Sequence, residues 1–228
     1  MTAPNSSLQV ISRKPPISDI IEIECDIWNL KLGTDINLPA HHLQACNYEH
    51  SSPFSQSIPP YINDFIGTTP PHHPDLEIFT DGSGLNDRIG CAFVTFQNSI
   101  EIYNQINRLD CTCSVFQAEL QAINLAINWT DQHYNHKTVH IIGDSSSAVQ
   151  LIHGSELHPI ATAIRKSILK SNNFYSITWT RAHNGTAGNE RADQLAKSAT
   201  NDDSLEIIYN KICHRSVRKL IFEELLNR

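Results

Sequence analysis

Three short apolar runs open the regularly patterned part of the chain. Each reads as a β-strand, because β-branched and aromatic residues recur in it: 76–80, 89–96 and 100–106. A short polar turn around Asn98 and Ser99 separates the second run from the third. Strands joined by such short turns pair as antiparallel neighbours. The region therefore predicts an antiparallel meander.

The pattern then changes to helical spacing. From Val115 to His133 apolar residues recur at steps of three and four and form one stripe. The segments that follow alternate between strand and helix: a strand over 138–143, helices over 145–152 and from Pro159 through Leu169, a strand over 175–181 and a helix over 189–200. This order predicts an α/β fold with a five-stranded mixed sheet, in which three antiparallel strands precede the parallel ones and helices flank the sheet.

Residues 1–74 lack this regularity. Ten of the 11 prolines lie there, together with a serine-rich stretch near 51–57. Only the apolar segment Ile17–Leu32 fits a strand or a short helix. We predict three parts: a Pro/Ser-rich flank over 1–74 whose function the sequence does not reveal, a folded domain over 75–200 and a tail over 201–228.

Four acidic residues stand where their carboxylates would meet at one point. Asp81 and Asp144 each close an apolar run, while Glu119 and Asp193 lie within helix-patterned stretches. In sheets of this kind, sites form at the carboxyl ends of strands. Gathered carboxylates repel one another unless a hard cation lies between them, and Mg²⁺ prefers such oxygen ligands. The cluster predicts a magnesium site suited to phosphodiester hydrolysis.

Each of these residues also has a plainer explanation when it is taken alone. An Asp at a strand end is usually a turn former or a helix cap, and a Glu beside an apolar stripe is usually a paired surface group. His183 alone fits an ordinary loop histidine, and Gly185 and Gly188 fit backbone turns. Their joint occurrence over more than a hundred residues favours a functional site.

The order of elements and acidic residues resembles the type 1 ribonuclease H family. The match is carried by Thr80-Asp81-Gly82-Ser83, Ala118-Glu119-Leu120, Gly143-Asp144-Ser145 and the block from Ala182 to Asp193. From His183 onward, that block fits the family pattern H-x-G-x-x-G-N-E-x-A-D at every fixed position. The resemblance covers about residues 75–200 and implies a ribonuclease H-like fold there.

The resemblance also implies an activity and the residues that perform it. The reaction would be endonucleolytic hydrolysis of the RNA strand of an RNA–DNA hybrid with two Mg²⁺ ions, for which Mn²⁺ is a substitute. The catalytic metal ligands would be Asp81, shared by both ions, Glu119 and Asp144 on one ion, and Asp193 on the other. His183 would transfer a proton or aid product release. Contacts to the substrate would come from Gly82, Ser83, Ser145 and Asn189.

A narrower resemblance is to the ribonuclease H domains that follow the reverse transcriptase in non-LTR retrotransposons of animals. Residues 114–123 resemble their usual sequence around the helical Glu, and residues 206–228 resemble the helical segment after their domain. This implies a reverse transcriptase domain as a partner in a longer polyprotein, of which the chain would be a truncated fragment.

Two other functions stay open on the sequence. Integrases and transposases share the fold and cut DNA with three carboxylates, although the 183–193 block argues against them. A catalytically idle remnant would only bind nucleic acid or a protein partner, although the presence of all four carboxylates argues against decay. Cleavage tests on a hybrid and on duplex DNA would separate these functions.

The charge balance predicts a weak hold on nucleic acid. Lys and Arg number 17 against 24 Asp and Glu, a net charge of −7, and residues 75–200 carry 9 against 12. Affinity for nucleic acid depends strongly on basic groups that neutralise phosphates. The one local basic cluster, Arg165, Lys166 and Lys170, fits a solvated helix face as well as a phosphate contact.

Two departures from the family strengthen this prediction. Val115 and Phe116 stand where the bacterial enzyme has Asn residues that help to read the minor groove of the hybrid. Residues 153–158 join two helices directly and leave no room for the basic handle of some relatives. We therefore predict weak hybrid affinity unless an attached polymerase domain supplies the hold.

The cysteines, the histidine pairs and the lack of long apolar runs bear on where in the cell the protein works. The six cysteines lack zinc-site spacing and are too few for a disulfide scaffold, which predicts reduced thiols in an intracellular protein. Two adjacent histidine pairs, at 41–42 and 72–73, lie in turn-like sequence and do not share a helix face, which disfavours a metal site there. No apolar run approaches the ~20 residues of a membrane span, and the N-terminus lacks a signal pattern. We predict no membrane association and a place in the cytoplasm or nucleus.

Overall fold

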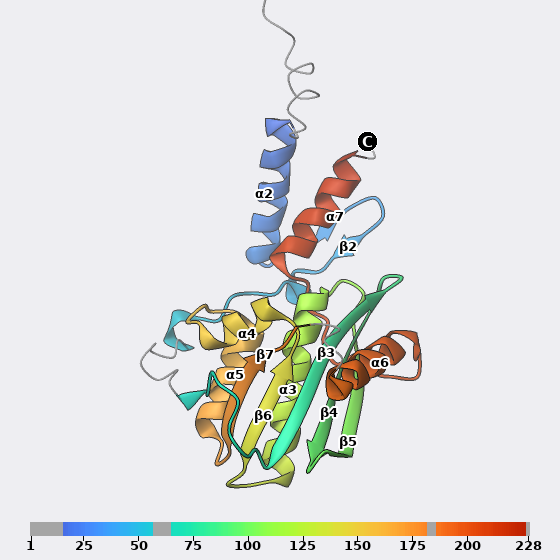
Figure 1. Cartoon of the computed structure of the whole chain (residues 1–228). Helices are drawn as coiled ribbons and strands as arrows, with labels where there is room; N and C mark the ends of the chain where they lie inside the picture. The colour runs from blue at the N-terminus through green and yellow to red at the C-terminus, as the bar shows by residue number, and fades with distance from the viewer. Residues whose placement is uncertain (1–15, 57–64, 182–185, 227–228) are drawn as a thin grey trace, which may run out of the picture. The chain divides into compact units, whose positions relative to one another are not determined.

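The computed structural model of the chain describes residues 16–56, 65–181 and 186–226. The chain divides into two compact units, one built from residues up to Glu49 with those from Ile212 onward, and one that runs from His50 to Lys211. The larger unit contains a five-stranded sheet (Figure 1). The domain predicted over 75–200 lies inside this unit, and its predicted boundaries stay a prediction.

The sheet has the strand order β5-β4-β3-β6-β7. Three antiparallel strands come first along the chain: β3 (Leu76–Leu85), β4 (Arg88–Gln97) and β5 (Ile100–Leu109). β6 (Thr138–Gly143) then runs parallel to β3, and β7 (Phe174–Trp179) runs parallel to β6. This arrangement confirms the predicted fold class, a mixed sheet that begins as an antiparallel meander.

Two tight turns build the meander. Asn98 and Ser99 have φ angles of 52° and 63° between β4 and β5, which confirms the predicted turn. Asn86 and Asp87 have φ angles of 49° and 58° between β3 and β4. Paired positive φ angles suit two-residue hairpins, because they match the twist of the flanking strands.

β3 is longer than predicted. The prediction that the strand covers 76–80 and that Asp81 stands at its end is wrong, since β3 continues to Leu85. Asp81 pairs with Ala92 of β4, and Gly82 pairs with Cys91. An Asp-Gly sequence favours a turn locally, but pairing with β4 outweighs that preference and the turn falls at the end of the hairpin instead.

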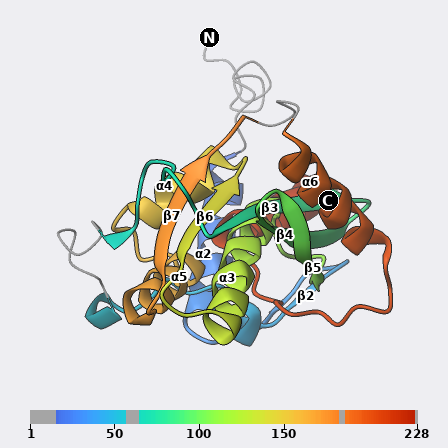
Figure 2. The ribbon, with the colours of Figure 1, turned by 60° about the horizontal axis from the view of Figure 1, so that its bottom comes forward.

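Helices cover both faces of the sheet (Figure 1 and Figure 2). The larger core contains strand residues such as Ile78 and Phe93 and three helices: α3 (Val115–His133), α4 (Ser146–His153) and α5 (Pro159–Lys170). A second core packs Phe79 and Val94 against α6 (Ala187–Asn201). Neighbouring strand residues thus point to opposite faces, as the two-residue period of a strand requires.

Two glycines let α6 lie directly on the sheet. A Cβ at Gly188 would stand 2.3 Å from ring carbons of Phe79, and a Cβ at Gly90 would stand 2.7 Å from the carbonyl oxygen of Ala196. Either side chain would force the helix away from β3 and β4. Because this contact is so close, the first turns of α6 have a fixed position beside the sheet.

Arg165 corrects the predicted basic cluster. Its side chain on α5 is 2% exposed. The guanidinium donates hydrogen bonds to the carbonyl oxygens of Leu151, Gly154 and Glu156, all in or just after α4. Arg165 therefore fastens the connection between α4 and α5, and is neither a solvated surface residue nor free to contact phosphate. The direct join of the two helices over 154–158 is confirmed.

The smaller unit pairs two helices, α2 (Ile17–Lys31) and α7 (His214–Leu226). Beside them lie the strands β1 (Ile36–Asn37) and β2 (His42–Leu43) and the 3-10 helix η1 (Ala45–Asn47), while the second 3-10 helix, η2 (Phe54–Gln56), belongs to the larger unit. The segment predicted as a strand or a short helix is thus a helix, and within the predicted tail the residues His214–Leu226 form a helix.

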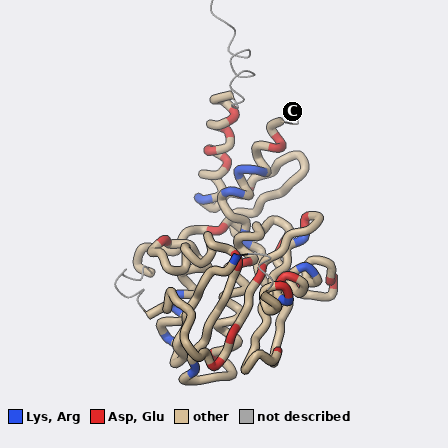
Figure 3. Tube along the Cα trace, in the orientation of Figure 1, with Lys and Arg blue, Asp and Glu red and all other residues tan. Residues whose placement is uncertain are grey.

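The charges of the two helices are complementary. Figure 3 shows acidic residues along α2 and basic residues in the first half of α7. Arg218 and Glu24 form an ion pair between them, and Ile27 and Val217 belong to their shared core. Among the described residues, no helix of either unit combines the length and apolar character that crossing a bilayer requires.

Candidate active site

The strand register places two of the predicted acidic residues side by side. Thr80 of β3 pairs with Gly143, the last residue of β6. Asp81 therefore follows Thr80 on β3, and Asp144 follows Gly143 directly after the end of β6. At this point β6 ends while β3 continues with β4 alone, so the edge beyond β6 leaves room for both carboxylates.

Glu119 reaches the same point from α3. The helix begins after Ser114, whose hydroxyl accepts a hydrogen bond from the Gln117 backbone N–H while the Gln117 side chain accepts one from the Ser114 N–H. Such a capping box fixes the first turn of a helix. A Cβ at Gly82 would stand 2.6 Å from the Glu119 nitrogen. The absence of a side chain at Gly82 thus lets this turn touch β3 directly beside Asp81.

The three acidic residues form one cluster. Asp81, Glu119 and Asp144 each contribute a carboxylate oxygen, and these oxygens lie within 4.8 Å of one another. Asp81 is 6% exposed and Glu119 is 7% exposed. Three elements from separate parts of the chain therefore aim their carboxylates at one small volume.

Electrostatics of the cluster oppose full ionisation. Burial first, and then the charges of Asp144 and Asp193, raise the pKa of Asp81 to about 7. Burial likewise raises the pKa of Glu119 well above its usual value, followed by the charges of Asp81 and Asp144. Hydrogen bonding to the backbone of Gly82 opposes both shifts. At neutral pH the negative charges of the cluster are thus not balanced by neighbouring positive charges.

A divalent cation fits this donor set. All three groups offer oxygen, which suits hard ions such as Mg²⁺ and Mn²⁺ better than softer ions that favour sulfur or nitrogen. Their shared repulsion would be relieved by a positive charge between them. Since Asp81 and Glu119 are nearly inaccessible to water, bulk solvent relieves it poorly.

Asp193 stands slightly apart from the cluster. It lies on α6 and acts electrostatically on Asp81, but its oxygens do not belong to the group within 4.8 Å. Its Oδ2 instead accepts a hydrogen bond from Lys197 Nζ at 2.8 Å. The predicted fourth ligand is therefore near the site and engaged by a cation from its own helix.

The other predicted site residues are Asn189, Ser145, Ser83 and His183. Asn189 lies one helical turn before Asp193, is 5% exposed, and has no hydrogen-bond partner for Oδ1 within the described part of the chain. Ser145 caps α4, where its hydroxyl accepts from the Ala148 N–H. Ser83 is a partly exposed residue of β3 opposite Gly90. His183 lies outside the described residues.

One neighbour of the site was not predicted. Trp179 ends β7, pairs with Gly143 and is 51% exposed. Its indole N–H donates a hydrogen bond of 2.9 Å to the carbonyl oxygen of Asp144. Trp179 therefore fixes the backbone that carries this carboxylate. The sequence signal was an aromatic residue within the strand predicted over 175–181.

Comparison with known families decides the assignment. The family model for RNase H matches residues 73–201, more than half of the chain. The chain belongs to the RNase H family. It is thus a ribonuclease H, an enzyme of the class that hydrolyses the RNA strand of RNA–DNA hybrids. The three clustered carboxylates all lie within the RNase H match.

A solved structure is also similar to this RNase H. The crystal structure of RNase H1 from the halophilic archaeon Halobacterium salinarum NRC-1 has 20% sequence identity and a TM-score of 0.48, and the similarity covers 56% of this chain and 98% of that chain. The comparison with curated proteins found no match.

Proposed function

We propose that this ribonuclease H cleaves the RNA strand with a pair of Mg²⁺ ions, for which Mn²⁺ can substitute. Asp81, Glu119, Asp144 and Asp193 would be the ligands. The observation that supports this most is the group of three carboxylate oxygens within 4.8 Å of one another, contributed by β3, α3 and the end of β6. Without a cation between them, the repulsion among these carboxylates would not be compensated.

Each acidic residue would have a distinct task. Asp81, which is buried and on which the charges of Asp144 and Asp193 both act, would be shared by both ions, with Glu119 and Asp144 completing one site and Asp193 the second. When bound, a pair of divalent ions activates the attacking water and stabilises the leaving 3′ oxygen. His183 would accept or return a proton beside the reacting phosphate, since an imidazole titrates near neutral pH.

The substrate would be oriented by polar groups around the carboxylates. The buried Oδ1 of Asn189 is free among the described residues to accept a hydrogen bond from the RNA strand, for which a 2′-hydroxyl is a suitable donor. We assign Gly82, Ser83 and Ser145 to the same surface because they adjoin Asp81 and Asp144 in sequence.

Positive charge near the site is scarce. With Arg165 buried, Lys166 and Lys170 are what remains of the predicted basic cluster, and Lys166 Nζ donates to Gln56 Oε1 at 2.8 Å. We propose that the hold on the hybrid comes from elsewhere, namely a reverse transcriptase domain of a retrotransposon polyprotein. The resemblance of residues 114–123 to such elements supports this origin. None of the six cysteines, all of which lie in the described ranges, forms a disulfide, which is compatible with work in the cytoplasm or nucleus.

Anomalous scattering tests the metal assignment. Crystals of the full chain grown with Mn²⁺ are expected to give an anomalous peak among the oxygens of Asp81, Glu119 and Asp144. A second peak beside Asp193 is expected once a hybrid is bound, because the substrate's phosphate supplies further oxygen ligands. Mn²⁺ peaks confined to other acidic surfaces would contradict the proposal.

A further inference from the structure

Three polar side chains follow one face of α6. Asn189, Asp193 and Lys197 are spaced by four residues, which places them one above another along the helix. The close contact of Gly188 with Phe79 fixes this helix against β3. The face therefore has a defined direction, and both Asp193 and Lys197 act electrostatically on Asp81.

Lys197 already supplies a cation to this face. Its Nζ lies 2.8 Å from Oδ2 of Asp193. The Lys197 side chain is 56% exposed and that of Asp193 is 26% exposed. A half-exposed lysine on a flexible stem forms only a weak ion pair. The ammonium can therefore leave Asp193 without disturbing the fold.

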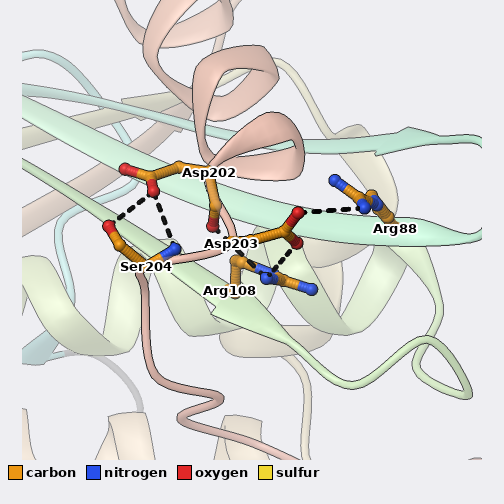
Figure 4. A network of polar contacts seen from close by, with 5 residues as sticks. All are labelled: Arg88, Arg108, Asp202, Asp203 and Ser204. Atoms are coloured by element: carbon orange, nitrogen blue, oxygen red, sulfur yellow. Dashed lines mark hydrogen bonds and ion pairs between the residues drawn. The ribbon is translucent and has the colours of Figure 1, made fainter.

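Other basic residues near α6 are engaged elsewhere. Arg191, two residues before Asp193, pairs with Glu101 of β5 at 3.1 Å. Arg88 and Arg108 both bind Asp203, just after α6, at 3.2 and 2.9 Å (Figure 4). Within the described ranges, Lys197 is the basic residue that both contacts Asp193 and acts on Asp81.

We propose that Lys197 is a built-in counter-ion that competes with the second divalent cation for Asp193. This inference rests on the proposed function. While Lys197 holds Oδ2 of Asp193, that oxygen is not available as a ligand. A divalent ion carries twice the charge and displaces the ammonium, but only at a higher concentration than an unpaired Asp193 would require. Lys197 thereby sets the metal concentration at which the site fills.

Metal binding by the full chain tests the proposal. Mn²⁺ titrations with a saturating, non-cleavable RNA–DNA hybrid present, followed by electron paramagnetic resonance of the free ion, would compare the wild type with Lys197→Met. We expect Lys197→Met to bind the weaker of two Mn²⁺ ions about three- to tenfold more tightly, since a repelling charge is removed. Lys197→Arg, which keeps the charge, should stay within twofold of the wild type.

Lys219→Met provides the matched control. Lys219 also forms a pair four residues along its helix, with Glu223 at 3.7 Å, but in the smaller unit. Its removal should leave Mn²⁺ binding unchanged. In hybrid cleavage, Lys197→Met should reach its optimum at a lower Mg²⁺ concentration, with the KM for the hybrid unchanged.

Mn²⁺ affinity and the KM for the hybrid together distinguish the outcomes that would overturn the proposal. If Lys197→Met binds Mn²⁺ like the wild type and instead raises the KM for the hybrid, Lys197 contacts the substrate's phosphates and the counter-ion proposal is overturned. If neither quantity changes, Lys197 is only a surface ion pair and the proposal is equally wrong. If the wild type itself binds no Mn²⁺, the proposed two-metal function fails before Lys197 is considered.

Discussion

Asp144→Asn is expected to lower Mg²⁺-dependent cleavage of an RNA–DNA hybrid by about 10³-fold or more, since groups that stabilise developing charge have effects of this size. The amide is neutral and a poorer ligand for a hard cation, so the cluster with Asp81 and Glu119 loses one of its three charges. The measurement is the initial rate with a labelled hybrid under single-turnover conditions, which separates chemistry from product release.

The same variant should keep its fold. The Asp144 carbonyl oxygen accepts from Trp179, and the preceding Gly143 accepts from the Thr180 backbone N–H at 2.9 Å. Neither contact involves the carboxylate. Asp203→Asn is a suitable control, since it removes an acidic residue bound to Arg88 and Arg108 at the far end of α6. Wild-type cleavage by Asp144→Asn would exclude the proposed site.

Asp81→Asn is expected to stabilise the metal-free chain at pH 8 by about 1–3 kcal/mol. The folded-state pKa of Asp81 is raised to about 7 from 3.8. Between these values the folded chain binds a proton that the unfolded chain has released. The free energy of unfolding therefore falls as pH rises from about 4 to about 7. Asn resembles the protonated form of Asp81, so the variant does not lose this free energy of unfolding as the pH rises.

Thermal or urea unfolding with a chelator present measures the effect. The gain from Asp81→Asn should be near zero at pH 4 and reach its full size above pH 7. Mg²⁺ should then stabilise the wild type more than the variant, because the ion binds only the folded state. A gain of the same size at every pH would show that proton binding at Asp81 is not its source.

Asp75→Asn tests the sign of this argument. Asp75 stands just before β3, and its pKa is lowered, first by a hydrogen bond from the Thr138 backbone N–H and then by Lys137. A lowered folded-state pKa contributes stability above pH 4 that disappears as the pH falls. Asp75→Asn should therefore lose stability at pH 8, opposite to Asp81→Asn, in the same unfolding experiment.

Local patterns were sufficient for most of the elements. α3 occupies the predicted residues because its apolar stripe is continuous and Ser114 caps it. β6 also matches, as a short apolar run between turn residues. Asp81 and Asp144 could be placed side by side because parallel strands bring equivalent ends together. These signals are encoded within a few residues of the sequence.

The errors arise where distant residues decide the outcome. β3 continues past Asp81 because β4 pairs with it, although the Asp-Gly sequence resembles a turn. Arg165 belongs in sequence to a basic cluster expected on the surface. In the structure it is buried and donates hydrogen bonds to carbonyl oxygens of Leu151 and Gly154. The Asp193–Lys197 pair was visible as a four-residue spacing, yet its relation to Asp81 depends on how α6 packs on the sheet.

Strand-resolved cleavage tests whether this chain hydrolyses the RNA strand of a hybrid with the help of divalent metal ions. The full chain would be incubated with a hybrid whose RNA and DNA strands carry different labels, and with duplex DNA of the same sequence. We expect cleavage of the RNA strand only, with Mg²⁺ present, ending in 3′-hydroxyl and 5′-phosphate products and abolished by a chelator. Cleavage of either DNA substrate, or undiminished cleavage in the chelator, would contradict the account.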